Sequence, residues 1–168
     1  MNTIDAIKKR RTIRKYKNGV TIPDEHIKTI LEAAMMAPSA CNTRPWEYVV
    51  LKSEDAKGRA LNIHPAAQHL KDASVGIIVC ARPNLQNGRA EGYYPQDCGA
   101  AIENILLAAL ELGYGSGWCG IYPRDERVNQ FKEEFGISSL PLALVVIGES
   151  DEEPDARGFY DEKLVTII

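Results

Sequence analysis

The sequence predicts a single domain of the α+β class that covers residues 1–168. Three runs rich in apolar, aromatic or β-branched residues have the length of strands, at 46–52, 74–81 and 140–149. Segments with helical features lie before the first of these runs and between the second and the third. A chain of 168 residues is long enough to bury a substantial core, and no repeat, low-complexity tract or linker divides it.

Four segments are predicted to form helices. The first is a short helix within residues 2–10, for which Thr3 is the expected N-cap. The clearest pattern is 23–37, where a Pro-Asp pair suits a helix start and apolar residues recur at i, i+3, i+4 and i+7. The segment 124–136 is amphipathic and is expected at the surface. A fourth helix, at 97–113, ends at a glycine.

The helix at 97–113 and the C-terminus both carry more apolar surface than a small domain buries easily. Between Gly99 and Gly113, ten of thirteen residues are apolar, which is typical of a core helix or of a dimer interface. The last six residues, 163–168, read as a strand that needs a sheet to join, in this chain or in another. The segment 82–95, punctuated by Gly, Pro and Asn, is predicted to be an exposed loop that borders a site.

Positive charge is concentrated near the N-terminus. The chain has 20 Lys and Arg against 23 Asp and Glu, and seven of those bases lie within 8–17. A solvated surface and a site for a small phosphate are both open interpretations. Nucleic acid is disfavoured because the rest of the chain is acidic and would repel a polyanion. Arg10 and Arg14 share a face if helical geometry persists, and arginine suits phosphate oxygens.

Several classes of protein are excluded by what the sequence lacks. No apolar run approaches the roughly 20 residues that a membrane helix needs, and the N-terminus has no apolar core of a signal peptide. The four cysteines show no metal-binding spacing and are expected to be reduced, which predicts a cytoplasmic protein without a metal site. No nucleophile constellation is evident, and a redox enzyme whose cofactor carries the chemistry would need none.

Two short segments favour contact with a planar ligand. In 37–50, Ser39, Asn42 and Arg44 alternate with small residues, as in a loop that grips a heterocycle, although they could equally cap the neighbouring helix and strand. The segment 115–120, GSGWCG, follows a helix, so it is not a dinucleotide-binding turn. It indicates a close approach of backbone to a bulky group, or a plain helix end followed by a strand.

Four segments in this order resemble the FMN-dependent nitroreductase family, in its short form. They are RRTIRKY at 10–16, APSACNTRPW at 37–46, DCGAAIENILLAALELGYGSGW at 97–118 and PLALVVIGESDEEP at 141–154. Together they span nearly the whole chain. The resemblance implies a mostly antiparallel central sheet flanked by helices, in an intertwined homodimer whose C-terminal strand joins the partner's sheet.

The resemblance also implies an activity. NADH or NADPH would give a hydride to N5 of FMN, and the reduced flavin would pass electrons to a nitro compound, a quinone or a related conjugated acceptor, with no catalytic side chain. A dehalogenase or dehydrogenase of the same fold, and a non-catalytic flavin- or phosphate-binding protein, remain alternatives. The expected partners are a second copy of the chain and a small-molecule acceptor, with no nucleic acid and no membrane.

The residues that match the family's motifs inherit roles toward FMN. The phosphate and ribityl chain would be held by Arg10, Arg11, Thr12, Arg14 and a base from the tail, Arg157. The isoalloxazine would be lined, from the other subunit, by Pro38, Ser39, Ala40 and Asn42. The reactive edge would face Cys119 and Gly120.

Two positions depart from the family's pattern. Arg44 stands where the family usually has Gln, and it either reaches the pyrimidine edge of the flavin or faces solvent beside a carboxylate such as Glu47. The polar residue expected near the pyrimidine edge, just before the second strand, has Gln68 and His69 as candidates.

Overall fold

The computed structural model describes residues 1–168 and contains one four-stranded sheet in the order β1-β2-β4-β3. The strands are β1 (Trp46–Leu51), β2 (Val75–Ala81), β3 (Gly115–Gly120) and β4 (Leu140–Gly148), and every neighbouring pair is antiparallel. The three strands expected from the sequence are confirmed. The glycine-rich segment 115–120 supplies the fourth strand, as expected for a helix end followed by a strand. Its proposed approach to a bulky ligand stays a prediction.

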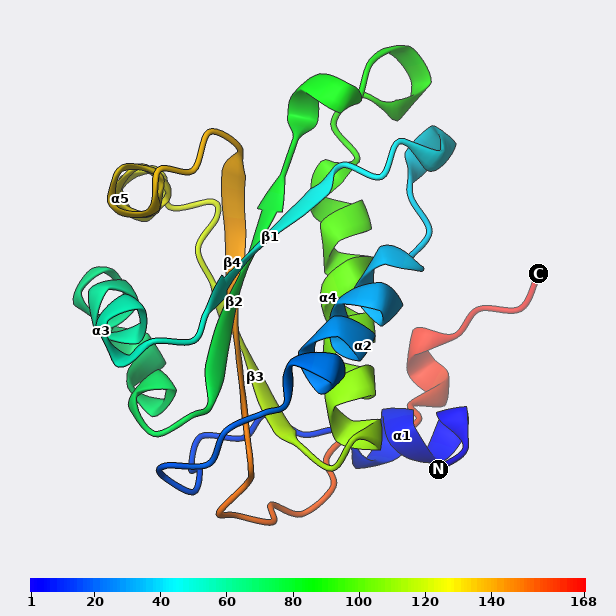
Figure 1. Cartoon of the computed structure of the whole chain (residues 1–168). Helices are drawn as coiled ribbons and strands as arrows, with labels where there is room; N and C mark the ends of the chain where they lie inside the picture. Colours follow the sequence, from blue (N-terminus) through cyan, green and yellow to red (C-terminus); the bar gives the residue numbers. More distant parts are fainter.

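Five α-helices surround the sheet (Figure 1). Helices α2 (Asp24–Met35) and α4 (Tyr94–Glu111) cover one face, and α3 (Glu54–Ile63) and α5 (Asp125–Phe135) cover the other. Helix α1 (Thr3–Lys9) packs against α4 near the N-terminus. None of these helices combines the length and the apolar character that crossing a membrane would require.

The core forms two layers because the central strands alternate between the two faces. Ile77 and Val79 of β2 point toward α2 and α4, whereas Ile78 and Cys80 join the cluster under α3 and α5. Every residue of β2 is buried, which explains why its sequence is a continuous apolar run. Burial also explains the apolar residues on the inner side of α4. Ile102 and its neighbours there pack in the core between the sheet and helices α2 and α4.

Several expectations need correction. Helix α3 and the 3-10 segment η2 (Pro65–Lys71) were not anticipated, although Ser53 begins α3 as an N-cap that accepts a hydrogen bond from Ala56 N. The segment expected as an exposed loop at 82–95 contains two 3-10 turns, η3 (Pro83–Leu85) and η4 (Gly88–Ala90), and its last two residues begin α4.

The C-terminal residues form no strand within the chain. Glu162–Leu164 make a single 3-10 turn, η5, and the residues after it have no regular structure (Figure 1). The apolar side chains there are left exposed, with Leu164 at 84% and Ile167 at 93%. Pairing of this segment with the sheet of a second copy stays a prediction.

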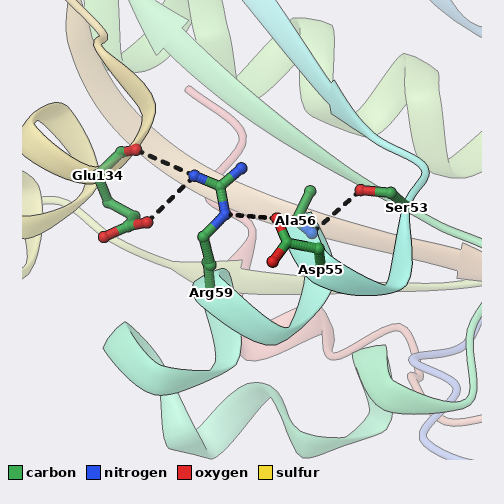
Figure 2. A network of polar contacts seen from close by, with 5 residues as sticks. All are labelled: Ser53, Asp55, Ala56, Arg59 and Glu134. Carbon is green, nitrogen blue, oxygen red and sulfur yellow. Dashed lines mark hydrogen bonds and ion pairs between the residues drawn. The ribbon is translucent and has the colours of Figure 1, made fainter.

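A polar network joins α3 to the end of α5 (Figure 2). The Arg59 guanidinium pairs with Asp55 at 3.0 Å and with the Glu134 carboxylate at 3.1 Å. It also lies over the ring of Phe135, 5.1 Å from the centroid. Because the guanidinium is partly exposed, this network contributes on the order of 1 kcal/mol, and its main effect is to fix how the two helices meet.

The basic segment near the N-terminus is docked onto β3. Ile13 N donates to the carbonyl of Ser116 at 2.9 Å, and Thr12 forms a parallel bridge with the same residue. Glycine permits this approach, because a Cβ on Gly115 would lie 2.8 Å from Ile13 Cγ1. A Cβ on Gly117 would lie 3.2 Å from the carbonyl oxygen of Ile13. The sequence analysis inferred that backbone approaches closely at GSGWCG. At Gly115 and Gly117 the approaching group is Ile13 of the basic segment.

Gly115→Ala should destabilise the protein by roughly 1–3 kcal/mol, because the added methyl overpacks the contact with Ile13. Urea unfolding measures this loss, and faster hydrogen exchange at the Ile13 amide should accompany it. Gly58→Ala is the matched control, since no atom lies within 4 Å of the added methyl in α3. There alanine should stabilise by about 0.5–1 kcal/mol. Equal effects of the two substitutions would contradict the packing explanation.

Candidate functional site

Two cavities open beside the docked basic segment. One, of about 480 Å³, lies over β3 and is lined by Arg10, Thr12, Glu103, Leu106, Ser116, Gly117, Trp118 and Gly120. The other, of about 670 Å³, lies between the basic segment, α1, the end of α4 and residues 150–156 of the tail. Arg10 lines both cavities, so the two are adjacent.

Charges in the first cavity are already partly paired. Arg10, at the C-terminal end of α1, donates from Nε to Oε1 of Glu103 on α4 at 2.9 Å. An anion that binds here must share or displace this carboxylate. Trp118 stands at the cavity with 46% of its surface exposed, so the wall offers an aromatic face as well as charge.

The second cavity brings Arg11 together with the acidic tail. Lys9 and Arg11 line one side, and Glu152, Glu153 and Asp155 line the other. Arg157 follows the last tail residue of this lining, is exposed, and forms no ion pair or hydrogen bond.

Glu152 fixes the path of the basic segment. One carboxylate oxygen accepts hydrogen bonds from the backbone N–H groups of Arg14 and Lys15, at 2.5 and 3.1 Å. These bonds, the Arg14 one foremost, lower the pKa of the Glu152 carboxyl below its ordinary value of 4.5. Asp151 N donates to the carbonyl of Lys15 at 2.9 Å, so the tail and the basic segment run side by side.

His69 and Cys119 meet next to this segment. The Cys119 Sγ lies 3.6 Å from His69 Nε2, and the imidazole stacks on Tyr16 with centroids 6.2 Å apart. Burial, followed by the charge of Arg14, lowers the pKa of His69, while burial raises the pKa of the Cys119 thiol. Both side chains are therefore neutral at pH 7. Of the two candidates before β2, His69 contacts Cys119 of β3, although it lines neither cavity, whereas Gln68 is exposed.

The end of β3 is held by two residues that the sequence analysis did not identify. The carbonyl of Gly120 accepts a hydrogen bond from Arg127 Nη1 at 2.9 Å and lies 3.0 Å from His64 Nε2. His64 is 5% exposed, and burial followed by the Arg127 charge lowers its pKa. No periodic pattern pairs His64 with a carbonyl 56 positions away. Arg127 is only 7 positions from Gly120, but a turn and the start of α5 separate them.

The loop at 38–44 lies far from both cavities in the folded molecule. Figure 1 shows η1 (Ala40–Asn42) at the opposite end of the molecule from α1, and neither cavity includes any residue of this loop. Arg44 Nε donates to Asn42 Oδ1 at 3.1 Å, and Arg44 N donates to Ser39 Oγ at 3.0 Å. Arg44 thus contacts its own loop and forms no ion pair with Glu47, while its side chain remains exposed.

Within one chain the expected site is divided into two groups. The structure places Arg10, Arg11, Thr12 and Gly120 in the linings of the two cavities. His69 and Cys119 contact each other beside β3 but line neither cavity, and Arg14 follows Ile13 in the docked segment. It places Pro38, Ser39, Ala40, Asn42 and Arg44 apart from them.

Comparison with known proteins decides the family. The model of the nitroreductase family matches residues 7–72 and 64–149, which is most of the chain. The chain belongs to the nitroreductase family. The basic segment, β3 and the loop at 38–44 all fall inside the matched residues.

Individual members of the nitroreductase family agree with this assignment. A protein of Methanothermobacter thermautotrophicus described as an NADH dehydrogenase/NAD(P)H nitroreductase is 39% identical over 96% of this chain and 84% of its own. A structure from Parabacteroides distasonis, described in the same words, has a TM-score of 0.91 at 28% identity and covers 99% and 98% of the two chains. An FMN-dependent nitroreductase from Clostridium difficile has a TM-score of 0.84 at 31% identity, with 98% of each chain covered.

The Glu152 contact predicts an acid-sensitive part of the stability. Because the folded pKa of Glu152 lies below 4.5, its contribution is complete above that pH and is lost as the pH falls through the lowered value. Wild type should exceed Glu152→Gln in free energy of unfolding at pH 7, and the difference should shrink as the pH drops below 4.5. Glu153→Gln, whose carboxylate makes no hydrogen bond, is the control and should track wild type throughout. A difference that does not vary with pH would contradict the role of the Glu152 charge.

Proposed function

We propose that this nitroreductase-family chain binds FMN beside β3 and passes electrons from NADH or NADPH to a nitro compound, a quinone or a related conjugated acceptor. The family assignment makes it a flavin-dependent oxidoreductase. The observation that carries the site is the basic segment docked on a glycine-rich strand, with cavities of about 480 and 670 Å³ along it.

The residues present fit the phosphate of FMN. Arg10, Arg11 and Thr12 line the adjoining cavities and supply charged and hydroxyl donors, which suit phosphate oxygens. Arg14 adds positive charge close enough to lower the pKa of His69, and Arg157 follows the tail residues of the larger cavity. Glu103 would exchange part of its contact with Arg10 for solvent when the phosphate binds.

The residues along β3 fit the flat ring. Gly117 and Gly120 bring backbone rather than side chains to the smaller cavity, and Trp118 adds an apolar wall. When bound, FMN supplies the ring whose N5 accepts the hydride from the nicotinamide. The chain's own contribution is to bind and orient the ring, with His64 and Arg127 holding the Gly120 carbonyl and with a neutral His69 beside Cys119.

We propose that the second group of site residues reaches the flavin from a second copy of the chain. Pro38, Ser39, Ala40 and Asn42 would line the isoalloxazine of the partner's site, with Arg44 beside them. Three features support a homodimer. The outer side of α4 is only half buried, as at Leu107. One edge of β1 has no neighbouring strand, and Leu164 and Ile167 of the C-terminal segment are exposed.

The four free cysteines suit a reducing compartment, for which we propose the cytoplasm.

The absorbance spectrum of the purified protein tests the proposed function most directly. A bound flavin gives a yellow protein, and that protein should oxidise NADH or NADPH and turn over in the presence of a quinone or nitroaromatic acceptor. Flavin binding without oxidation of either nucleotide would favour a non-catalytic flavin protein. A colourless protein that cannot be loaded with FMN would contradict the proposal.

FMN binding should depend on the basic segment. Losing one charge-assisted contact costs about 1.5–3 kcal/mol, so Arg10→Ala should weaken FMN binding roughly tenfold or more. The double variant Arg10→Ala, Arg11→Ala should purify largely without flavin. Lys8→Ala is the matched control, because Lys8 lines neither cavity. Unchanged flavin content in the double variant would remove the phosphate assignment.

Removal of the C-terminal segment should weaken the dimer. A chain that ends before Lys163 lacks the exposed apolar residues expected to join the partner's sheet. Size-exclusion chromatography with light scattering should show a shift toward monomer, with lower Tm and lower flavin retention. Full-length Thr166→Ser, which leaves the apolar residues in place, is the control. A truncated protein that stays dimeric and fully loaded with flavin would contradict strand exchange.

A further inference from the structure

Within the loop at 38–44, residues 39–44, here called the loop at 39–44, adopt a backbone conformation that these residue types do not favour. Cys41, Asn42 and Arg44 all have positive φ, at 50°, 54° and 48°, and none of them is glycine. Left-handed backbone is disfavoured for residues with a Cβ, least so for Asn. The side chains of all three are exposed, so burial of the loop's own side chains does not impose this shape. Hydrogen bonds within the loop and contacts from other elements together hold it.

A buried carboxylate provides one such contact. Asp97 lies in the first turn of α4 and is 7% exposed. Both of its carboxylate oxygens lie 3.1 Å from Ala40 N, and the backbone N–H donates to them. The positive end of the α4 dipole favours a carboxylate at this position. Asp97 therefore anchors the loop to the helix just before its left-handed residues begin.

A buried amide provides the second contact. Gln86, between η3 and η4, is 6% exposed, and its Nε2 donates to Asp97 Oδ2 at 2.6 Å and to Thr43 Oγ1 at 3.1 Å. The amide orientation follows from chemistry, because an ionised carboxylate can only accept. This orientation leaves Gln86 Oε1 buried without a donor. The Thr43 hydroxyl in turn donates to the carbonyl of Ala40 at 2.9 Å, which closes the loop on itself.

We propose that Asp97 and Gln86 are positioning residues that hold the loop at 39–44 in the shape in which it meets the flavin. The inference rests on the proposed function, in which this loop lines the FMN of the partner subunit. An apolar pair at 86 and 97 would avoid the desolvation of a buried carboxylate. Only polar groups, however, can satisfy the Ala40 N–H and fix the strained backbone. Strained backbone of this kind is a common feature of functional sites.

The first test is an FMN titration of the apoprotein, followed by flavin fluorescence, for wild type, Asp97→Asn and Gln86→Met. Loss of one charge-assisted hydrogen bond predicts roughly tenfold weaker FMN binding for Asp97→Asn. Hydrogen exchange at the Ala40 amide should become faster in the same variants without FMN. Asp97→Asn with wild-type affinity would overturn the proposal.

Changes at Cys41 distinguish the positioning role from general destabilisation. If Asp97 acts by holding left-handed backbone, Cys41→Gly in the Asp97→Asn background should recover part of the lost affinity, because glycine adopts positive φ without strain. Cys41→Val in the otherwise wild-type protein should weaken FMN binding, because a β-branched residue resists that conformation. Absence of both effects would mean that Asp97 does not act through the loop's backbone.

Lys57→Met is the stability control. Lys57 is 4% exposed, and its Nζ donates to the carbonyl of Ala73 at 2.8 Å, on the face of the sheet covered by α3 and α5. The substitution leaves a buried acceptor unpaired and should lower Tm with no change in FMN affinity, measured where all variants are folded. Equal losses of affinity in Lys57→Met and Asp97→Asn would overturn the positioning role. Wild type that binds no FMN would instead overturn the proposed function, and the Ala40 exchange would still report whether Asp97 holds the loop.

Discussion

The contact of the basic segment with β3 is the constraint on which the candidate site depends. It rests on the bond from Ile13 N to the Ser116 carbonyl and on the missing side chains of Gly115 and Gly117. A third glycine, Gly148 on β4, does the same for Tyr16, since a Cβ there would lie 2.9 Å from the Tyr16 ring. Backbone approach at this distance positions the arginines along a strand edge, with the Arg10 side chain paired to Glu103.

Much of the positive charge that marks this segment is compensated inside the chain. Lys8 and Lys9 lie in the last turn of α1, where the helix dipole favours bases. Arg10 pairs with Glu103, and the Glu152 carboxylate caps the backbone of Arg14 and Lys15. A few acidic side chains, Glu103, Glu149 and Glu152, contact the basic segment, whereas many others lie on α2, α3 and α5. The partial pairing along the segment favours a compact site for one small anion over an extended basic surface.

Two anchoring systems at opposite ends of the chain serve the proposed flavin site. At one end the tail and β3 enclose the basic segment, and at the other Asp97 and Gln86 hold the loop at 39–44. The segment 82–95 links this second end to the core through buried Gln86 and Ala90. Most of its residues are exposed, as its composition suggested, while Gln86 ties it to the loop at 39–44 and to α4.

The sequence by itself determined the fold class, three of the four strands, the family and the identity of most candidate residues. These follow from local patterns. Apolar runs indicate buried strands, and short motifs such as RRTIRKY and APSACNTRPW indicate the family. Only the tertiary structure decided which residues meet. His64 with Gly120, Asp97 with Ala40 and Arg10 with Glu103 are separated by 56, 57 and 93 positions, and no periodicity encodes such pairs. The tertiary structure also fixed what the glycines of β3 accommodate, because that depends on which segment packs against them.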